Sequence, residues 1–243
     1  MRIAFISDIH GNMVALEAVL KDIKRRNVQQ IICLGDVATI GLQPQEVIET
    51  LQELKCPCIM GNHDLPLIDS YKAMELTLFA DDLFHSLCWT LDHVTEKHLD
   101  FIRSFETTIT IPDNSGRELL CYHGVPQNNY TGIFPATSES ELRPYLDGIH
   151  HQVFVGGHTH LQMNRNYNGK LLLNPGSVGH VFNSSHSPQK EPRLQPWAEY
   201  GILAGTQKQI SFEMKRIPFD VEKVKSIIRR TDHPLKEWWM KQY

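Results

Sequence analysis

Polar side chains with metal-binding chemistry follow short apolar runs at five places in this sequence. In the clearest case the apolar residues 153–155 are followed by Gly156 and Gly157 and then by His158 and His160. Histidine is the commonest metal ligand, and residues two apart on extended backbone face the same side, so the pair could bind one ion or two adjacent ions. A solvated polar loop is the alternative for this stretch taken alone, because short histidine-rich stretches occur by chance.

The same arrangement recurs at four other places, which argues against chance. In each of them an apolar run that is typical of a buried strand is followed by acidic, amide or imidazole side chains. These are Asp8 and His10 after residues 2–6, Asp36 after residues 30–34, Asn62, His63 and Asp64 after residues 58–60, and His123 after residues 118–122. Taken alone, Asp8 would be a hydrogen-bond acceptor of a loop, and Asn12 is expected to cap the helix that follows it.

The elements between these runs predict how the side chains come together. Amphipathic helices are expected over residues 14–23 and from Pro44 to Leu54, so that strands and helices alternate. Such alternation is typical of βαβ units with parallel strands, and functional residues collect beyond the carboxyl ends of those strands. We therefore expect all five groups of polar residues at one edge of a sheet.

The later segments complete an α/β fold. Two hairpins are expected, one joining residues 106–111 to 118–122 through a turn at 113–116, and one joining 161–167 to 170–173 through an Asn-Gly turn. The remaining predicted elements are helices at 138–146 and 221–230 and an antiparallel pair of strands at 200–204 and 209–217.

Residues 65–105 are predicted to be helical and to form the wall of a substrate pocket, without a catalytic cluster of their own. Some histidines are expected not to be ligands, because they have helical spacing or no strand before them: His85, His93 and His98 in this region, and His180 and His186 beyond it. The segment 183–197, which is rich in Ser, Pro, Gln and Lys, is expected to be an exposed loop.

The composition favours one soluble domain covering residues 1–243. Apolar residues make up 41% and charged residues 21%, close to the averages of globular proteins. No run reaches the roughly 18 apolar residues that a membrane span needs. The formal charge of −4 argues against a protein that coats nucleic acid. Because no secretion signal is evident, we expect a cytoplasmic protein. The oligomeric state is not predicted.

The five cysteines are expected to be reduced and structural. Cys56 and Cys58 could form a metal or redox pair, but no second pair of cysteines accompanies them. Most of the cysteines lie inside apolar runs, where a thiol behaves as a small hydrophobic group.

The set of candidate ligands is too large for a single ion. Two carboxylates, one amide and at least four imidazoles exceed what one tetrahedral ion needs, and they suit two ions about 3.5–4 Å apart. Asp36 would bridge the two ions. The absence of thiolates argues against structural zinc, and mixed imidazole and carboxylate ligands fit Mn, Fe or Zn.

Taken together, these motifs resemble those of the calcineurin-like metallophosphoesterases, in particular the small prokaryotic phosphodiesterase branch. The family pattern DxH, GDxxxxG, GNH(D/E), H and GHxH occurs here in order. The matching residues are Asp8-Ile9-His10, Gly35-Asp36 through Gly41, Gly61-Asn62-His63-Asp64, His123 and Gly157-His158-Thr159-His160. The resemblance implies a four-layer αββα sandwich with two mixed β-sheets flanked by helices.

The resemblance also implies a ligand set and a reaction. Asp8, His10 and His160 would hold a first ion and Asn62, His123 and His158 a second, with Asp36 shared and manganese favoured. The implied reaction is hydrolysis of phosphate mono- or diesters, in which the ions clamp phosphate oxygens and a bridging hydroxide attacks phosphorus. His63 would face the leaving group as a proton donor or transition-state stabiliser, and Asp64 would orient its ring. A loop-capping role is the alternative for Asp64.

Two departures from the family pattern bear on the substrate. After Asp36 the chain lacks the Asp-Arg pair of the protein phosphatase branch, so a small phosphorylated substrate, including a nucleotide-like one, is favoured over a phosphoprotein. The segment after Asn174-Pro175-Gly176-Ser177 is longer than in many relatives, which leaves open whether Arg193 contacts the substrate; no substrate-binding residue is assigned.

Two other functions are compatible with parts of the sequence pattern. A non-catalytic metal-binding scaffold of the same fold is the alternative, although a scaffold has no need of His63. A metallo-β-lactamase-like hydrolase would need a clustered HxHxDH motif, which is absent.

Overall fold

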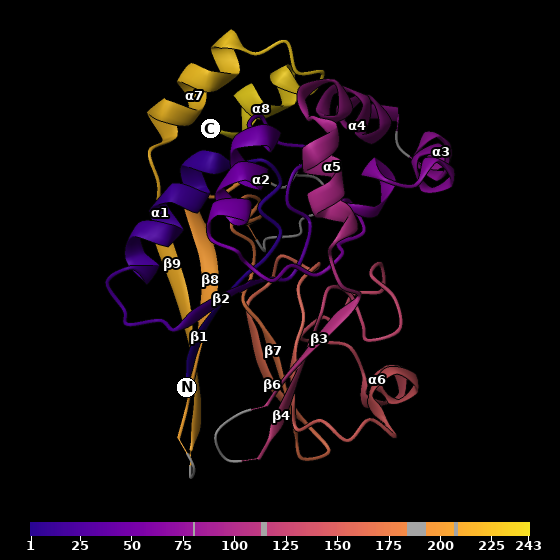
Figure 1. Cartoon of the computed structure of the whole chain (residues 1–243), viewed down its shortest axis with the longest axis vertical. Coiled ribbons are helices and arrows are strands. Elements are labelled where there is room, and N and C mark those ends of the chain that lie inside the picture. Colours follow the sequence, from indigo (N-terminus) through magenta and orange to yellow (C-terminus); the bar gives the residue numbers. More distant parts are fainter. Residues whose placement is uncertain (80, 113–115, 184–192, 207–208) are drawn as a thin grey trace.

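Two mixed β-sheets pack face to face in the computed structural model, which describes residues 1–79, 81–112, 116–183, 193–206 and 209–243 (Figure 1). The first sheet has four strands in the order β2-β1-β8-β9. Their bounds are β1 Arg2–Ile6, β2 Gln30–Cys33, β8 Trp197–Gly205 and β9 Ile210–Pro218. Strands β1 and β2 are parallel, as expected for a βαβ unit, and β8 pairs antiparallel with both β1 and β9.

The second sheet has five strands in the order β3-β4-β5-β7-β6. Their bounds are β3 Thr108–Pro112, β4 Glu118–Tyr122, β5 Val153–Val155, β6 Met163–Tyr167 and β7 Lys170–Asn174. The three central strands β4, β5 and β7 are parallel, and the two predicted hairpins, β3-β4 and β6-β7, form the edges. The carboxyl ends of β4 and β5 therefore lie side by side.

Helices cover the outer face of each sheet and complete the four-layer sandwich (Figure 1). Helices α1 (Met13–Ile23) and α2 (Pro44–Glu53) pack on the first sheet, and α6 (Glu139–Leu146) packs on the second. A separate apolar cluster fills the space between the sheets, with Phe5 and Ile32 from one and Leu119 and Val153 from the other. The predicted fold class is thus confirmed.

Six further helices gather at one end of the molecule (Figure 1). They are η1 Leu65–Leu67, α3 Ser70–Phe79, α4 Asp81–His93, α5 Glu96–Arg103, α7 Val221–Arg230 and α8 Lys236–Gln242. The helical character of residues 65–105 is confirmed, but α8 was not predicted. Helix α8 is held by Trp239, whose side chain is buried and whose Nε1 donates a hydrogen bond to the Ile40 carbonyl at 3.0 Å.

Three expectations need correction or lie outside the described residues. Residues 58–60 do not form a strand but only isolated bridges, Cys58 to Cys33 and Ile59 to Glu106. The polar groups also lie at the edges of two facing sheets, not of one. His186, most of the loop at 183–197 and the turn residues Asp113, Asn114 and Ser115 lie outside the described residues.

Two further sequence predictions can be compared with the structure. All five cysteines are free, and four of them are buried, whereas Cys88 is partly exposed. Cys58 Sγ donates to the Cys56 carbonyl at 3.2 Å, so the buried role expected for this pair is confirmed. Among the described residues, none of the helices has the length and apolar character needed to cross a membrane.

Candidate metal centre

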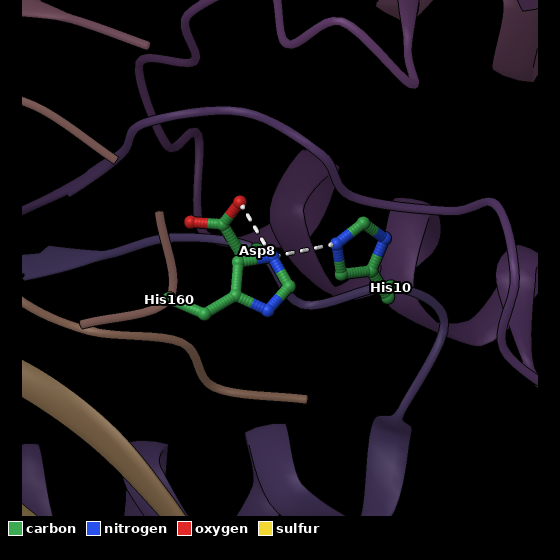
Figure 2. Close-up of side chains that lie close together, drawn as sticks. All are labelled: Asp8, His10 and His160. Carbon is green, nitrogen blue, oxygen red and sulfur yellow. Dashed lines mark hydrogen bonds and ion pairs between the residues drawn. The ribbon is translucent and has the colours of Figure 1, made fainter. Parts of the chain in front are cut away.

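Asp8, His10 and His160 form a first group of converging side chains (Figure 2). Asp8 and His10 follow β1 in the first sheet, and His160 follows β5 in the second. His160 Nε2 lies 3.2 Å from Asp8 Oδ1 and 3.3 Å from His10 Nε2. Three potential ligand atoms from two sheets therefore surround one point.

Asp36, His123 and His158 form a second group, and Asn62 completes it. His123 Nε2 lies 3.3 Å from Asp36 Oδ2. The amide oxygen of Asn62 lies 3.0 Å from His123 Nε2 and 2.8 Å from His158 Nδ1. This group also joins the sheets, since Asp36 follows β2 whereas His123 and His158 follow β4 and β5.

One carboxylate faces both groups. Asp36 Oδ2, which is 3.3 Å from His123 Nε2, is also 3.8 Å from His10 Nε2 of the first group. The other oxygen of Asp36 accepts a hydrogen bond from the backbone N–H of His63 at 2.8 Å, which fixes the orientation of the carboxylate. The structure thus brings all seven predicted ligands together, with Asp36 between the two groups.

The backbone at this site is unusual. Five of the seven candidate ligands have positive φ angles, between 45° and 69°: Asp8, His10, Asp36, His158 and His160. Asp and His adopt this left-handed conformation more often than most residues, but it is uncommon outside glycine and concentrates at functional sites. The sharp turns let successive polar side chains point toward the centre instead of continuing the strand.

Two glycines of the motifs allow the loops to approach each other closely. A Cβ on Gly61 would lie 2.0 Å from Asp36 Oδ1, and a Cβ on Gly157 would lie 2.1 Å from Ser7 Oγ and 3.2 Å from Asp8 Oδ2. A side chain at Gly61 would therefore displace Asp36, and one at Gly157 would displace Ser7 and crowd the neighbouring Asp8 carboxylate. Gly61 is thus needed for the position of the Asp36 carboxylate, and Gly157 for that of the Asp8 carboxylate.

Backbone carbonyls determine which nitrogen of two imidazoles faces the centre. His123 Nδ1 lies 2.6 Å from the Leu34 carbonyl, and His160 Nδ1 lies 2.7 Å from the His180 carbonyl. A carbonyl only accepts, so these Nδ1 atoms carry the hydrogen and Nε2 is the atom available to a metal. Metal-binding histidines are commonly oriented in this way.

The electrostatics of the two groups suit cation binding. Burial alone would raise the pKa of Asp36, but His123, His63 and His10 hold it well below its usual value. Burial alone would lower the pKa of His123, but Asp36 raises it to about 10. Burial lowers the pKa of His10 well below its usual value, so that its ring is neutral at pH 7. The Asp36 carboxylate is thus charged and lies beside protonated His123, whose proton a metal ion can replace.

A buried oxygen provides an independent test of whether a metal fits. Asp8 Oδ1 is buried and accepts no well-aligned hydrogen bond within the described residues; its near neighbour is His160 Nε2 at 3.2 Å, itself a candidate ligand, whereas Asp8 Oδ2 accepts a hydrogen bond from the His158 N–H at 3.1 Å. An unsatisfied buried carboxylate oxygen is costly unless a cation pairs with it. The donor set, nitrogen and oxygen without sulfur, fits a divalent transition-metal ion at each group.

Asp64 contacts the backbone of two turns at the site. Its two carboxylate oxygens accept hydrogen bonds from the backbone N–H groups of Asp36 at 2.7 Å, Val37 at 2.8 Å and Gly61 at 3.0 Å. Among the described contacts, none joins Asp64 to the ring of His63. Asp64 therefore caps and holds together the Asp36 and Gly61 turns. Its orientation of the His63 ring stays a prediction.

His63 is half-buried beside the first group. Its ring packs edge-on against His10, with ring centroids 5.3 Å apart. Burial lowers the pKa of His63, although Asp36 opposes this effect. The ring is consequently neutral at pH 7 and can donate one hydrogen bond toward a ligand at the metal centre.

His180 supports the site, a role that the sequence did not reveal. Its buried ring stacks on His10 with centroids 4.6 Å apart, and its carbonyl orients His160. It belongs to neither group of converging ligand atoms, in line with the expectation for it. The other histidines of the helical region, His85, His93 and His98, also lie outside both groups.

Comparison with known proteins identifies the class. The family model described as the calcineurin-like phosphoesterase superfamily domain matches residues 1–189. The chain therefore belongs to the calcineurin-like phosphoesterase superfamily. The match covers all seven candidate ligands, together with His63 and the Asn174–Ser177 turn.

Particular relatives extend this similarity over the whole chain. The uncharacterized protein MJ0912 of Methanocaldococcus jannaschii is 29% identical over 246 aligned positions, which cover 97% of this chain and 94% of that protein. The fold is similar to that of the hypothetical protein PH1004 from Pyrococcus horikoshii, with a TM-score of 0.82, 18% identity and coverage of 99% and 96%. A metallophosphoesterase from Sphaerobacter thermophilus gives a TM-score of 0.70, 23% identity and coverage of 94% and 93%.

Proposed function

We propose that this protein is a hydrolase of phosphate esters that works with two transition-metal ions, with manganese favoured over iron and zinc. The observation that carries the proposal is the pair of ligand groups sharing Asp36, whose Oδ2 lies within 3.8 Å of an imidazole nitrogen in each group. A structural metal site needs only one closed group of ligands, whereas two adjacent groups suit the clamping of a phosphate.

The candidate ligands would hold two ions, and His63 would contact the substrate. Asp8, His10 and His160 would hold one ion, and Asn62, His123 and His158 the other, with Asp36 shared. When bound, such ions neutralise the charge of phosphate oxygens and lower the pKa of coordinated water. His63, neutral at pH 7 because burial lowers its pKa, would donate an N–H hydrogen bond to an oxygen of the ester. This supports the role of transition-state stabiliser over that of proton donor.

The proposed substrate is a small phosphate ester. The formal charge of −4 does not suit a protein that binds a long polyanion, and no extended nucleic-acid surface is expected. The choice between mono- and diesters is left to experiment.

The first test is hydrolysis of generic esters. Metal-depleted protein reloaded with Mn²⁺ is expected to hydrolyse bis-p-nitrophenyl phosphate or p-nitrophenyl phosphate, measured by release of p-nitrophenolate. If both esters stay intact with Mn, Fe, Co, Ni and Zn in turn while the metals bind, the proposal is wrong. The chain would then be a metal-binding scaffold.

The second test separates catalysis from metal binding. The His63→Ala variant is expected to keep its bound metal, because His63 belongs to neither group of ligand atoms, and to lose about 10²–10³-fold in kcat. Metal content by elemental analysis and turnover are measured on the same sample. His85→Ala is the matched control, since His85 is exposed on α4 and should retain full activity. Loss of metal in His63→Ala would instead make His63 a ligand.

A further inference from the structure

A cavity of about 370 Å³ adjoins the second ligand group. Its lining includes Met60, Leu65, His123, Val125, Asn128 and Tyr130. His123 is among the residues that line the cavity, and its buried imidazole belongs to the second group, so the cavity lies next to the metal centre. The cavity is at the small end of the range for ligand sites, about 300–1,000 Å³, and suits a group the size of one nucleoside.

The loop that forms one wall of the cavity is held in a fixed shape. Val125 and Asn128 exchange two backbone hydrogen bonds of 2.9 and 3.2 Å. The side-chain oxygen of Asn128 accepts from the N–H groups of Tyr130 at 3.2 Å and Thr131 at 2.8 Å. Asn129 Nδ2 donates to the Gly61 carbonyl at 2.9 Å, which ties the loop to the segment that carries Asn62. The wall therefore exists before any ligand binds.

Tyr130 lies in this loop and lines the cavity with a largely exposed side chain. Its side chain is 65% exposed, and within the described parts of the chain it stacks on no other aromatic ring and its hydroxyl makes no hydrogen bond. An exposed aromatic ring on a fixed loop is available for stacking. The apolar part of the cavity lining, here called its floor, comprises Met60, Leu65, Val125 and Pro126.

Polar atoms beside Tyr130 have unused hydrogen-bonding capacity. Gln127 uses its side-chain nitrogen to donate to the Tyr145 carbonyl, and Asn128 uses its side-chain oxygen within the loop. The Gln127 oxygen, an acceptor, and the Asn128 amide N–H₂, a donor, have no protein partner among the described residues. An apolar floor, a free aromatic face and one donor and one acceptor at the edge match a planar heterocycle.

We propose that this cavity binds the base of a nucleotide-like phosphate ester, with the base stacked on Tyr130 and its edge toward Gln127 and Asn128. The proposal rests on the proposed function, because it takes the metal centre as the place where the phosphate binds. The organic part of the substrate would thus be a base, and Tyr130 would be the residue that selects substrates carrying one.

Binding of a fluorescent nucleotide tests the proposal without requiring turnover. The probe is 2-aminopurine riboside 5′-monophosphate, whose fluorescence falls when its base stacks. Titration with manganese-loaded protein should give saturable quenching, and Tyr130→Ala should raise the Kd about 5- to 100-fold. Tyr130→Phe keeps the ring and should stay within about threefold of the wild type. The matched control is Tyr71→Ala, since Tyr71 is 80% exposed on α3 and does not line the cavity.

Competition shows whether the base is what the cavity recognises. AMP should displace the probe at least about tenfold better than ribose 5-phosphate, which lacks a base, because base stacking alone contributes a factor of this size. Absence of quenching by the wild type, equal Kd values for wild type and Tyr130→Ala, or equal competition by the two phosphates would each overturn the proposal.

The two proposals fail separately. If the protein binds the probe through Tyr130 but hydrolyses no ester, the proposed function is wrong and the base-binding cavity stands. If it hydrolyses bis-p-nitrophenyl phosphate while Tyr130→Ala binds the probe as well as the wild type, only the cavity proposal is wrong. Metal content and circular dichroism of each variant exclude loss of metal or of fold as the cause.

Discussion

Asp64 supports the metal centre through the backbone, and this contact determines the effect of substitution. Its two oxygens accept three backbone N–H groups from the turns that carry Asp36 and Gly61. In Asp64→Asn an amide N–H₂ would face at least one of these donors and leave it unsatisfied. We expect the free energy of unfolding to fall by about 1–3 kcal/mol, measured by urea denaturation of the metal-free protein.

A second Asp→Asn substitution provides the control. Asp69 accepts hydrogen bonds from the N–H groups of Tyr71 and Lys72 at the start of α3, but through one oxygen only. Asp69→Asn keeps that acceptor and should change stability by less than about 0.5 kcal/mol. If Asp64→Asn is as stable as Asp69→Asn and loses only turnover, Asp64 acts on His63, as expected from the sequence.

At the scale of residues, sequence motifs predicted which side chains meet but not how they are supported. The recurrence of metal-binding residues after five apolar runs indicated converging ligands, whereas the spacing of His158 with His160 alone left a solvated loop as the alternative. Their left-handed backbone was not predictable, because Asp and His are compatible with several loop conformations. The role of His180 also depends on a stacking contact between distant segments, and no local pattern encodes such a contact.

At the scale of elements, the segment before α8 contains a pH-sensitive contact. His233 is buried, its Nδ1 accepts a hydrogen bond from the Leu235 N–H at 3.0 Å, and its Nε2 lies 3.2 Å from Ser86 Oγ of α4. Burial lowers the pKa of His233 to about 4, although the Asp232 charge opposes this. The folded protein therefore keeps this imidazole neutral at pH values where the unfolded chain protonates it.

The direction of the pH effect follows from this difference. The pKa of His233 in the folded state lies below its unfolded value of 6.5. The contribution of neutral His233 to the free energy of unfolding is therefore complete above pH 6.5 and is lost as the pH falls toward 4. In His233→Gln the loss of stability between pH 7 and pH 5 should be smaller than in the wild type by about 1–2 kcal/mol. Urea midpoints at the two pH values measure the difference, with exposed His85→Gln as the control. Parallel pH profiles of wild type and His233→Gln would contradict this assignment.

Regular elements were predicted well where local signals are strong. The apolar run at residues 118–122 predicted β4, and the Asn-Gly turn predicted the β6-β7 hairpin. Helix α8 was missed because it has only seven residues and its place is set by Trp239 packing on the rest of the fold. Residues 58–60 have the composition of a strand, but only isolated bridges link them to Cys33 and Glu106.

At the scale of the whole molecule, each metal ion would link the two sheets. The first group takes Asp8 and His10 from one sheet and His160 from the other, and the second group takes Asp36 from one and His123 from the other. Unfolding that separates the sheets must therefore release the ions. Metal binding should stabilise the fold as a whole and not merely order a loop.

Removal and return of metal test this link. At a free concentration of about 100 times Kd, one ion adds about 2.7 kcal/mol, which corresponds to a rise in Tm of roughly 5–10 °C for a chain of this size. Differential scanning calorimetry of chelated and Mn²⁺-reloaded protein measures the rise. Asp36→Asn, which alters the ligand shared by both groups, should lose most of it. An equal rise in Asp36→Asn would show that the ions bind elsewhere.

The left-handed turns at Asp8, His10, Asp36, His158 and His160 also determine whether this centre could be transplanted. A designer who copied the five short motifs into another α/β scaffold would transfer the ligand atoms but not the turns that aim them. The turn at Asp36 depends on Asp64, whose carboxylate accepts a hydrogen bond from the Asp36 backbone N–H. The positions of the Asp36 and Asp8 carboxylates depend on Gly61 and Gly157, where a Cβ would lie 2.0 and 3.2 Å from their oxygens. The smallest portable unit is thus the two facing sheets with their connecting loops, and not any linear peptide taken from them.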